Sequence, residues 1–399
     1  MGDVRAVRWG AARWVVAALL VLASLGAAVV LHIRHPDALV TLLPSADMRE
    51  LHVDFDTFWH SAVALTAGQD IYDTPAKLTN LNPPLLTVLL TPFAALDALT
   101  AYRVFAVLTL LIVVGSVLAV SRELRLHPAV TALATLAVLA SSPLHGTLVL
   151  GQIYPLLLAG LVAGWIAERR GRPVLAAVCY GVTVALKPSL APVLLLPAVQ
   201  RRWVPLRAGM AAAAGASLLG VLVAGPSSAF AWLRIAFTEP VPDTVDNASL
   251  PGLAVRIGIP SLVGTLLGAA VLVGTLAWCA RHRDRLDPAG TAPWAVLAAG
   301  LLFSPIAWHN YLMLLWPGVL ALIPLGRAAA ATGALAVAVI PVSWNAEWPP
   351  EGLGADLGRS LYCAILLAYW AVLLSSATRR PASSPAGASA PVEASGSRT

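Results

Sequence analysis

Two aspartates lie close together after the first long apolar stretch of the sequence. Asp54 and Asp56 belong to the run His52-Val-Asp-Phe-Asp-Thr-Phe-Trp59. Because the chain is 58% hydrophobic and only 12% charged, two carboxylates beside aromatic residues at the edge of a membrane protein point to a general base. The alternatives are that Asp54 caps a surface helix and that Asp56 is a solvated or capping carboxylate, which is the role we expect for Asp56.

Further polar groups stand at the predicted outer ends of apolar runs. An ionisable group at membrane depth costs a few kcal/mol and is therefore a functional hypothesis. All of these groups share the face predicted for Asp54, and they are Gln152 after Gly151, Lys187 before Pro188, His309 after Trp308, and Asn247 and Arg256 in one loop.

Each of these residues also has an ordinary explanation. Lys187 can snorkel to the membrane surface, although Pro188 breaks a helix there and favours a built site. His309 can belong to an interfacial aromatic belt. Asn247-Ala-Ser249 also fits a glycosylation sequon. The residue types alone leave these alternatives open.

The basic residues set the expected topology. Apolar runs at or somewhat below the ~20 residues that a bilayer requires recur along the chain, and about 12 of them predict an all-α polytopic membrane protein. Basic clusters such as Arg169-Arg170, Arg201-Arg202 and Arg379-Arg380 fall in alternate loops. With the N-terminus inside, the positive-inside rule places these loops and both termini on the cytoplasmic side of the plasma membrane. The formal net charge of +6 is thus not the basic stripe of a nucleic-acid-binding protein.

The segment 33–101 is expected to be the longest outer loop of a single membrane domain over residues 1–380. Within it, 57–68 has apolar residues at helical spacing and predicts a short helix on the membrane surface. The apolar segment 85–96 is too short for a span, so we expect a re-entrant or interfacial piece on the outer face. The tail over 381–399, rich in Ala, Ser, Pro and Gly, is expected to be disordered in the cytoplasm.

The sequence lacks the signatures of several other chemistries. Its three cysteines lie inside apolar segments, which argues against a disulfide framework and a zinc site. There is no phosphate-binding loop, no His-Glu-x-x-His and no Gly-x-Ser-x-Gly, and we expect no metal and no cofactor. No stretch provides an aqueous domain for a nucleotide, so a transferred group most simply comes from a lipid in the same membrane.

Six groups of residues, in order along the chain, resemble the glycosyltransferases of family 87, which are of the GT-C type. The resemblance extends from about residue 50 to residue 312, most of the chain. The residues that carry it are Asp54-Phe-Asp-Thr-Phe-Trp59 with Ala67-Gly-Gln-Asp-Ile-Tyr72, Asn82-Pro-Pro-Leu85, Gly151-Gln152, Lys187-Pro188, Asn247-Ala-Ser-Leu250 with Arg256, and Ser304-Pro-Ile-Ala-Trp-His309.

The resemblance implies an enzyme that uses a polyprenyl-phosphate sugar as donor on the outer face of the plasma membrane. Members transfer mannose, and some arabinofuranose, to lipoglycans, and this chain is most similar to the enzymes that extend phosphatidylinositol mannosides and lipomannan. Asp54 matches the acidic residue of the family, and His309 matches a polar position after Ser-Pro. The chain departs from the family pattern at Asn82, where a tyrosine often precedes the proline pair, and at Asp56, which is not typical.

An α-linked product from a β-linked polyprenyl-phosphate sugar requires inversion, and inversion needs one base. Asp54 would take the proton of the acceptor hydroxyl, while the leaving phosphate needs only positive charge or hydrogen-bond donors. We therefore expect Asp54 to be catalytic, with Lys187, Arg256 and His309 near the phosphate and no metal. The other expected substrate-binding residues are Asn82, Gln152 and Asn247, together with Asp56, Trp59 and His60.

The predicted function is inverting transfer of mannose from polyprenyl-phosphate-mannose to a phosphatidylinositol mannoside or lipomannan-type acceptor, through an α-1,2 linkage. The expected partners are the sugar donor, the glycolipid acceptor and membrane lipids, with no nucleic acid, and the expected state is a monomer. An arabinofuranosyltransferase is the first alternative, because no motif reports the ring size of the sugar. A lipid or solute transporter is the second, although the polar residues gather on one face and no internal repeat is evident. A non-catalytic scaffold is the third.

Overall fold

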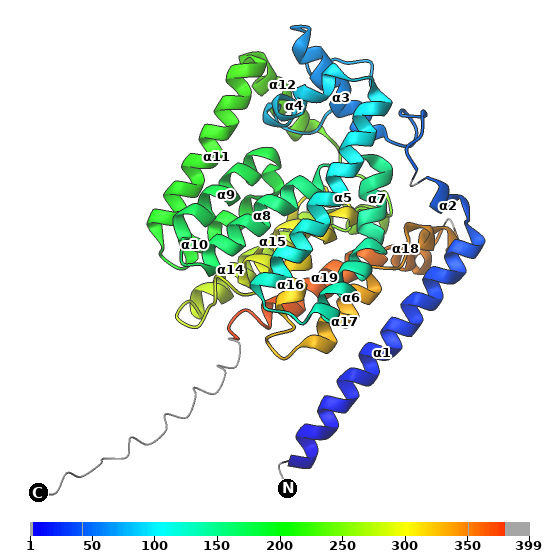
Figure 1. Cartoon of the computed structure of the whole chain (residues 1–399), viewed down its shortest axis with the longest axis vertical. Coiled ribbons are helices and arrows are strands. Elements are labelled where there is room, and N and C mark those ends of the chain that lie inside the picture. The colour runs from blue at the N-terminus through cyan, green and yellow to red at the C-terminus, as the bar shows by residue number, and fades with distance from the viewer. Residues whose placement is uncertain (1–2, 42, 350, 380–399) are drawn as a thin grey trace, which may run out of the picture.

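The computed structural model of the chain describes residues 3–41, 43–349 and 351–379. These residues form helices joined by turns and loops, as Figure 1 shows. The only β-type pairing within the described ranges is an isolated bridge between Asn247 and Trp308. The prediction of an all-α protein is therefore confirmed for this part of the chain. The predicted disordered tail over 381–399 lies outside the described residues.

Long apolar helices make this a multi-pass membrane protein. Four helices are long and apolar enough to cross a membrane, and two further pairs of helices pass the same test if each bent pair is one span. The four are α1 (Asp3–Arg34), α5 (Ala98–Glu123), α11 (Trp203–Ala224) and α14 (Ser261–Arg281). The bent pairs are α6 (Pro128–Leu139) with α7 (Ser142–Leu150), at 49°, and α18 (Leu353–Arg359) with α19 (Leu361–Leu374), at 56°.

Four to six full-length spans are fewer than the predicted number of about 12. The other apolar runs form shorter pieces, because prolines such as Pro188 and Pro192 interrupt them. Several of these pieces are buried, α16 along its whole length and α15 at all but its last residue. They therefore need not match the thickness of a bilayer. The shorter elements are α8 (Tyr154–Arg169), α9 (Pro173–Leu186), η2 (Pro188–Leu194), α10 (Leu195–Val199), α15 (Ala292–Phe303), η3 (His309–Leu315), α16 (Trp316–Ala321) and α17 (Ala328–Val337).

Short helices gather at one end of the molecule, drawn at the top of Figure 1. The helix expected over 57–68 begins earlier and is α3 (Val53–Thr66), so both aspartates of the opening motif lie in its first turn. The 85–96 segment forms α4 (Pro84–Leu90) and η1 (Thr91–Ala95), which together are too short to cross a membrane, as expected. Helix α12 (Pro226–Thr238) lies at the same end. The remaining short elements of the fold are α2 (Asp37–Val40), α13 (Leu250–Arg256) and η4 (Val342–Glu347).

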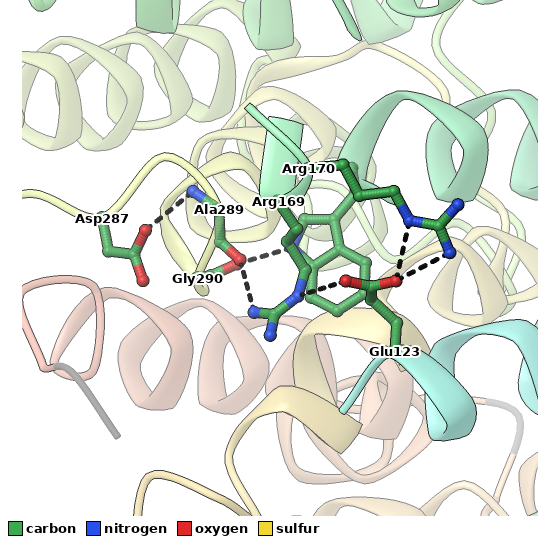
Figure 2. A network of polar contacts seen from close by, with 7 residues as sticks. Glu123, Arg169, Arg170, Asp287, Ala289 and Gly290 are labelled. Carbon is green, nitrogen blue, oxygen red and sulfur yellow. Dashed lines mark hydrogen bonds and ion pairs between the residues drawn. The ribbon is translucent and has the colours of Figure 1, made fainter. Parts of the chain in front are cut away.

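Basic clusters gather at the opposite end, where α1 begins and α19 ends (Figure 1). Figure 2 shows Glu123, at the end of α5, between two arginines at the end of α8. Its carboxylate lies 3.5 Å from Nε of Arg169 and 3.1 Å from Nη2 of Arg170. Arg169 also donates to the carbonyl of Ala289, at 3.2 Å, in the loop after α14. Loops that the positive-inside rule assigns to one side of the membrane are thus joined to one another by direct contacts.

We expect Glu123→Gln to lower the stability of the protein by about 1–2 kcal/mol, because a partly buried charge-assisted hydrogen bond is lost and two arginines lose their counter-charge. The measurement is the thermal unfolding midpoint of the full chain in detergent. Glu239→Gln is the control, since Glu239 is exposed and has no ion pair among the described residues. Equal midpoints for the two variants would contradict the assigned role of Glu123.

Candidate active site

The start of α3 is fastened to the end of α7. The His52 ring, just before α3, stacks on Tyr102 with the ring centroids 3.8 Å apart. Its Nδ1 lies 2.7 Å from the carbonyl oxygen of Val149, and its Nε2 accepts from the backbone N–H of Ser45 at 3.0 Å. The hydroxyl of Tyr102 donates to the carbonyl of Leu148. These partners require a neutral His52 that carries its proton on Nδ1. Burial lowers the pKa of this imidazole, which also favours the neutral form.

Gly151 allows α7 to approach α3 at close range. Its φ of +75° is in the left-handed region, and a Cβ at this position would overlap the Cβ of Phe55. Only glycine meets both conditions without strain. The next residue is Gln152, and its side chain hydrogen-bonds the carboxylate of Asp54. The Gly151-Gln152 motif thus works as one unit, in which the glycine sets the distance and the glutamine makes the polar contact.

Asp54 is a half-buried carboxylate, and its neighbours act on its pKa in opposite directions. Burial raises the pKa of Asp54 to about 6, and the charge of Asp246 raises it as well. The hydrogen bond from Gln152 and the positive charge of Lys187 lower the pKa but do not cancel the effect of burial. A carboxylate with a pKa close to the working pH is suited to take up a proton during a reaction.

Lys187 is connected to α3 through a chain of buried amides. It is an extended residue between α9 and η2, as the following Pro188 favours. Its Nζ donates to Oδ1 of Asn82 at 2.9 Å. The Asn82 side chain donates to Oδ1 of Asn80 at 3.1 Å, and Asn80 donates to Oγ of Ser61, in α3, at 3.1 Å. The structure therefore brings together Asp54, Asn82, Gln152 and Lys187.

Asp56 does not form a pair with Asp54. Residues two apart in a helix point in nearly opposite directions, at ~200°. Asp56 lies 3.7 Å from Nε2 of His60, one turn later, and its Oδ2 is buried with no hydrogen-bond partner among the described residues. Burial raises the pKa of Asp56, while the charges of His60 and Arg49 lower it. Trp59 is on the same side, with its ring centroid 5.0 Å from that of His60.

Asn247 holds two loops together. Its Nδ2 donates to the carbonyls of Pro242 and Pro305, at 3.1 and 3.0 Å. Its Oδ1 accepts from the backbone N–H of Ser249 and of Ala307, at 3.2 and 3.1 Å. Because this side chain is fully buried and its hydrogen-bonding groups are engaged, the glycosylation sequon has no accessible acceptor. Ser249 acts as the N-cap of α13.

Arg256 orders the same loop from the other side. Its Nε donates to Oγ of Ser360 at 2.8 Å, and its Nη2 donates to the carbonyl of Asn247 at 3.1 Å. Its Nη1 contacts the carbonyl oxygens of Asp243 and Thr244. Every nitrogen of the guanidinium thus has a partner within the protein, and the residue fixes the backbone on both sides of Asp246.

His309 is a buried, uncharged imidazole. Its backbone N–H donates to the carbonyl of Asp246 at 2.7 Å, and its ring lies between Gly146 and Tyr362, 4.9 Å from the Tyr362 ring centroid. Burial lowers the pKa of His309 to about 4, so at neutral pH the ring can donate or accept a hydrogen bond but carries no charge. Among the described residues neither ring nitrogen has a partner at full hydrogen-bond geometry, although the backbone of Ser142 acts on the ring in the direction that raises its pKa. An interior position of this kind does not fit a residue of an interfacial aromatic belt.

The sequence analysis did not identify Asp246 or the tyrosines of the site. Asp246 directly precedes the Asn247 motif, and its charge acts on both Asp54 and His309. Tyr154 begins α8 two residues after Gln152, and its ring centroid lies 4.5 Å from that of Tyr311. Their positions next to recognised motifs could have drawn attention to these residues. That signal is weak, because acidic loop residues and buried tyrosines are common in any protein.

Comparison with known proteins gives a family match. The profile of Glycosyltransferase family 87 matches residues 80–305, more than half of the chain. An alpha-(1->3)-arabinofuranosyltransferase of Mycolicibacterium smegmatis is 29% identical over 282 residues, which are 66% of this chain, and the chain spans 64% of the length of that relative. A polyprenol-phosphate-mannose-dependent alpha-(1-2)-phosphatidylinositol mannoside mannosyltransferase of Mycobacterium tuberculosis is 28% identical over 296 residues, 67% of this chain and 68% of the relative.

Among solved structures, ArnT from Cupriavidus metallidurans in the apo state aligns with 88% of this chain and 77% of its own. The identity is 19% and the TM-score is 0.39. A structure of ArnT bound to undecaprenyl phosphate aligns with a TM-score of 0.36. Similarity at this level is too weak to support an argument about this chain.

We expect Gly151→Ala to destabilise the protein more than Gly171→Ala does. Both glycines have a positive φ, of +75° and +69°, so alanine is strained at both. Only at Gly151 would the new methyl group also overlap Phe55, since nothing lies within 4 Å of a Cβ at Gly171. Overpacking adds about 1–3 kcal/mol to the strain. Thermal unfolding in detergent measures the difference, and equal losses would contradict the close packing of α3 on α7.

Proposed function

Because the chain belongs to glycosyltransferase family 87, we propose that it transfers a sugar from a polyprenyl-phosphate donor to a hydroxyl group of a glycolipid. In this proposal the protein has a GT-C architecture. The end that contains Asp54 lies on the outer face of the plasma membrane, and the basic end lies in the cytoplasm. The observation that carries the proposal is Asp54 itself, a half-buried carboxylate beside Gln152 and Lys187 with its pKa raised to about 6.

In the proposed reaction the acceptor hydroxyl oxygen attacks the anomeric carbon of the donor. The bond between that carbon and the phosphate oxygen breaks, and its electron pair leaves with the polyprenyl phosphate. The hydroxyl proton passes to the carboxylate of Asp54. One displacement inverts the anomeric carbon, through a transition state with oxocarbenium character, so a β-linked donor gives an α-linked product.

Lys187 is proposed to stabilise the leaving phosphate. Its hydrogen-bond partner Asn82 is a neutral amide, which positions the ammonium group without neutralising its charge. A preorganised positive charge near the developing anion lowers the barrier most effectively in a water-poor site. Gln152 is proposed to orient Asp54, and Asn82 to orient Lys187.

The remaining candidates receive more indirect roles in this proposal. Arg256 and Asn247 hold the loop that presents Asp246, since their polar atoms are bound to that loop and its neighbours. His309 offers an uncharged hydrogen-bonding ring to the substrate. A second group, Asp56, Trp59 and His60, is proposed to contact the acceptor along the other side of α3.

Mannose remains the proposed sugar, with a phosphatidylinositol mannoside or lipomannan-type acceptor and an α-1,2 linkage, as in the name of the mannosyltransferase relatives. Arabinofuranose is the second candidate, because four relatives named as arabinofuranosyltransferases match at 24–29% identity. The two groups of relatives are too similar in identity to this chain to separate the donors.

We expect Asp54→Asn to reduce sugar transfer by about 10²–10⁴-fold, the usual contribution of a general base. Asp56→Asn is the comparison variant: because Asp56 faces away from Asp54 and is proposed to contact the acceptor, it should raise the KM for the acceptor and lower kcat by less than about tenfold. Purified protein is incubated with synthetic polyprenyl-phosphate mannose or arabinofuranose and a panel of mannolipid acceptors, and the product linkage is determined by NMR. A larger loss of transfer for Asp56→Asn than for Asp54→Asn would make Asp56 the base. If the wild-type protein formed no glycosidic bond with any donor, the proposed enzymatic function would be wrong and the transporter would become the leading hypothesis.

The pH profile of the reaction tests the direction in which Lys187 and Asp246 shift the pKa of Asp54. Since Asp54 must be deprotonated to accept a proton, kcat/KM should rise as the pH increases through about 6. Lys187 lowers the pKa of Asp54 and Asp246 raises it. Lys187→Met should therefore shift the profile to higher pH, and Asp246→Asn should shift it to lower pH. Shifts of the two variants in the same direction would contradict this arrangement.

A further inference from the structure

A cavity of about 620 Å³ opens beside the first transmembrane helix, far from Asp54. It lies between α1, α17, α19 and the segment that joins α16 to α17. In Figure 1, α1 stands at the side of the bundle and its first turns are at the basic end. Only 22% of the apolar window of α1 is buried in the protein. The cavity therefore borders a helix whose surface is mostly left open to lipid.

Most of this cavity is lined by small and apolar side chains. Val16 and Leu20 of α1 face Ala330, Gly333 and Val337 of α17 across the cavity. At Gly333 a Cβ would come 3.3 Å from Cδ1 of Leu20, so the two helices nearly touch there. This contact closes one side of the cavity, whose lining there consists of aliphatic side chains and glycine. An unbranched hydrocarbon chain suits such a lining.

Three arginines from three different elements line the same cavity. Arg13 belongs to α1, Arg327 precedes α17, and Arg379 follows α19. Arg327 is held in place by its Nη1, which donates to Oγ of Ser375 and of Ser376, both at 2.6 Å. Burial lowers the pKa of Arg327, and the charges of Arg379 and Arg13 lower it further, because the three guanidinium groups act on one another.

No acidic residue is present among the described residues that line the cavity. Like charges brought together in a partly buried space repel one another unless an anion joins them. Guanidinium groups match the geometry of a phosphate, with two parallel N–H···O bonds from each. The cluster by Glu123 has its own carboxylate (Figure 2), whereas the residues that line this cavity supply none.

We propose that the cavity binds an anionic glycerophospholipid, with its phosphate among Arg13, Arg327 and Arg379 and an acyl chain along the apolar lining that α1 and α17 supply. The charge of the arginines selects the head group, and the apolar lining selects a lipid over a free anion. The lipid completes the contact of α1 with the bundle. It is separate from the donor site, because that site contains Asp54 and Lys187 at the other end of the molecule.

The test measures lipid-dependent stability of the full chain, purified in detergent. Dioleoylphosphatidylglycerol, dioleoylphosphatidylcholine or inorganic phosphate is added, and the thermal unfolding midpoint is recorded over a concentration series. We expect phosphatidylglycerol to raise the midpoint, and the other two to have little effect. A rise with inorganic phosphate equal to that with phosphatidylglycerol would show a simple anion site, and equal rises with the two lipids would show that charge plays no part; either result overturns the proposal.

The deciding variant is Arg13→Gln with Arg379→Gln, which leaves the anchored Arg327 in place. Its control is Arg281→Gln with Arg285→Gln, which removes the same charge at exposed positions outside the cavity. We expect about tenfold weaker binding of phosphatidylglycerol in the first variant and unchanged binding in the control, since two charge-assisted contacts are lost. Native mass spectrometry of the same samples counts bound phospholipid. Equal binding by the two variants would overturn the proposal.

Discussion

The close packing of α3 on the end of α7 is the constraint on which the candidate active site depends. Gly151 lets the two backbones meet at Phe55, and the side chains of His52 and Tyr102 bind the last carbonyls of α7. Because these contacts fix both the position and the rotation of α3, only one of its two first-turn aspartates faces Gln152 and Lys187. A small displacement of this helix would change which carboxylate is in the site.

The environment of Asp54 balances opposing effects. Partial burial disfavours the charged form, yet the first turn of a helix and a neighbouring lysine favour it. Asp246 adds a second negative charge on the same side. The net result is a carboxylate that is neither permanently ionised nor permanently protonated. Much of the remaining polar network serves to hold this balance, since the loop of Asp246 is fixed by Asn247 and Arg256.

The two ends of the molecule are chemically different. One end concentrates amides, a lysine and acidic groups around Asp54. The other concentrates arginines, some of which pair with Glu123 and Glu168 while others line the cavity beside α1. Between them lie long lipid-exposed helices and short buried ones. The buried pieces do not need the length of a span, because protein rather than lipid surrounds them. This explains why counting apolar runs gave too many full-length spans.

Several features were determined by the sequence alone. They are the helical membrane fold, the family, the gathering of the basic clusters at one end of the molecule, and most of the residues around Asp54. These follow from composition and local pattern, because hydrophobicity, helix breaks and short motifs are written along the chain. The face of α3 that each aspartate occupies, the uncharged state of His309 and the structural role of Arg256 and Asn247 were decided only by the tertiary structure. Burial and hydrogen-bond partners set these properties, and the partners come from segments far apart, such as Ser360 for Arg256 and Asn82 for Lys187. No local pattern records such pairings.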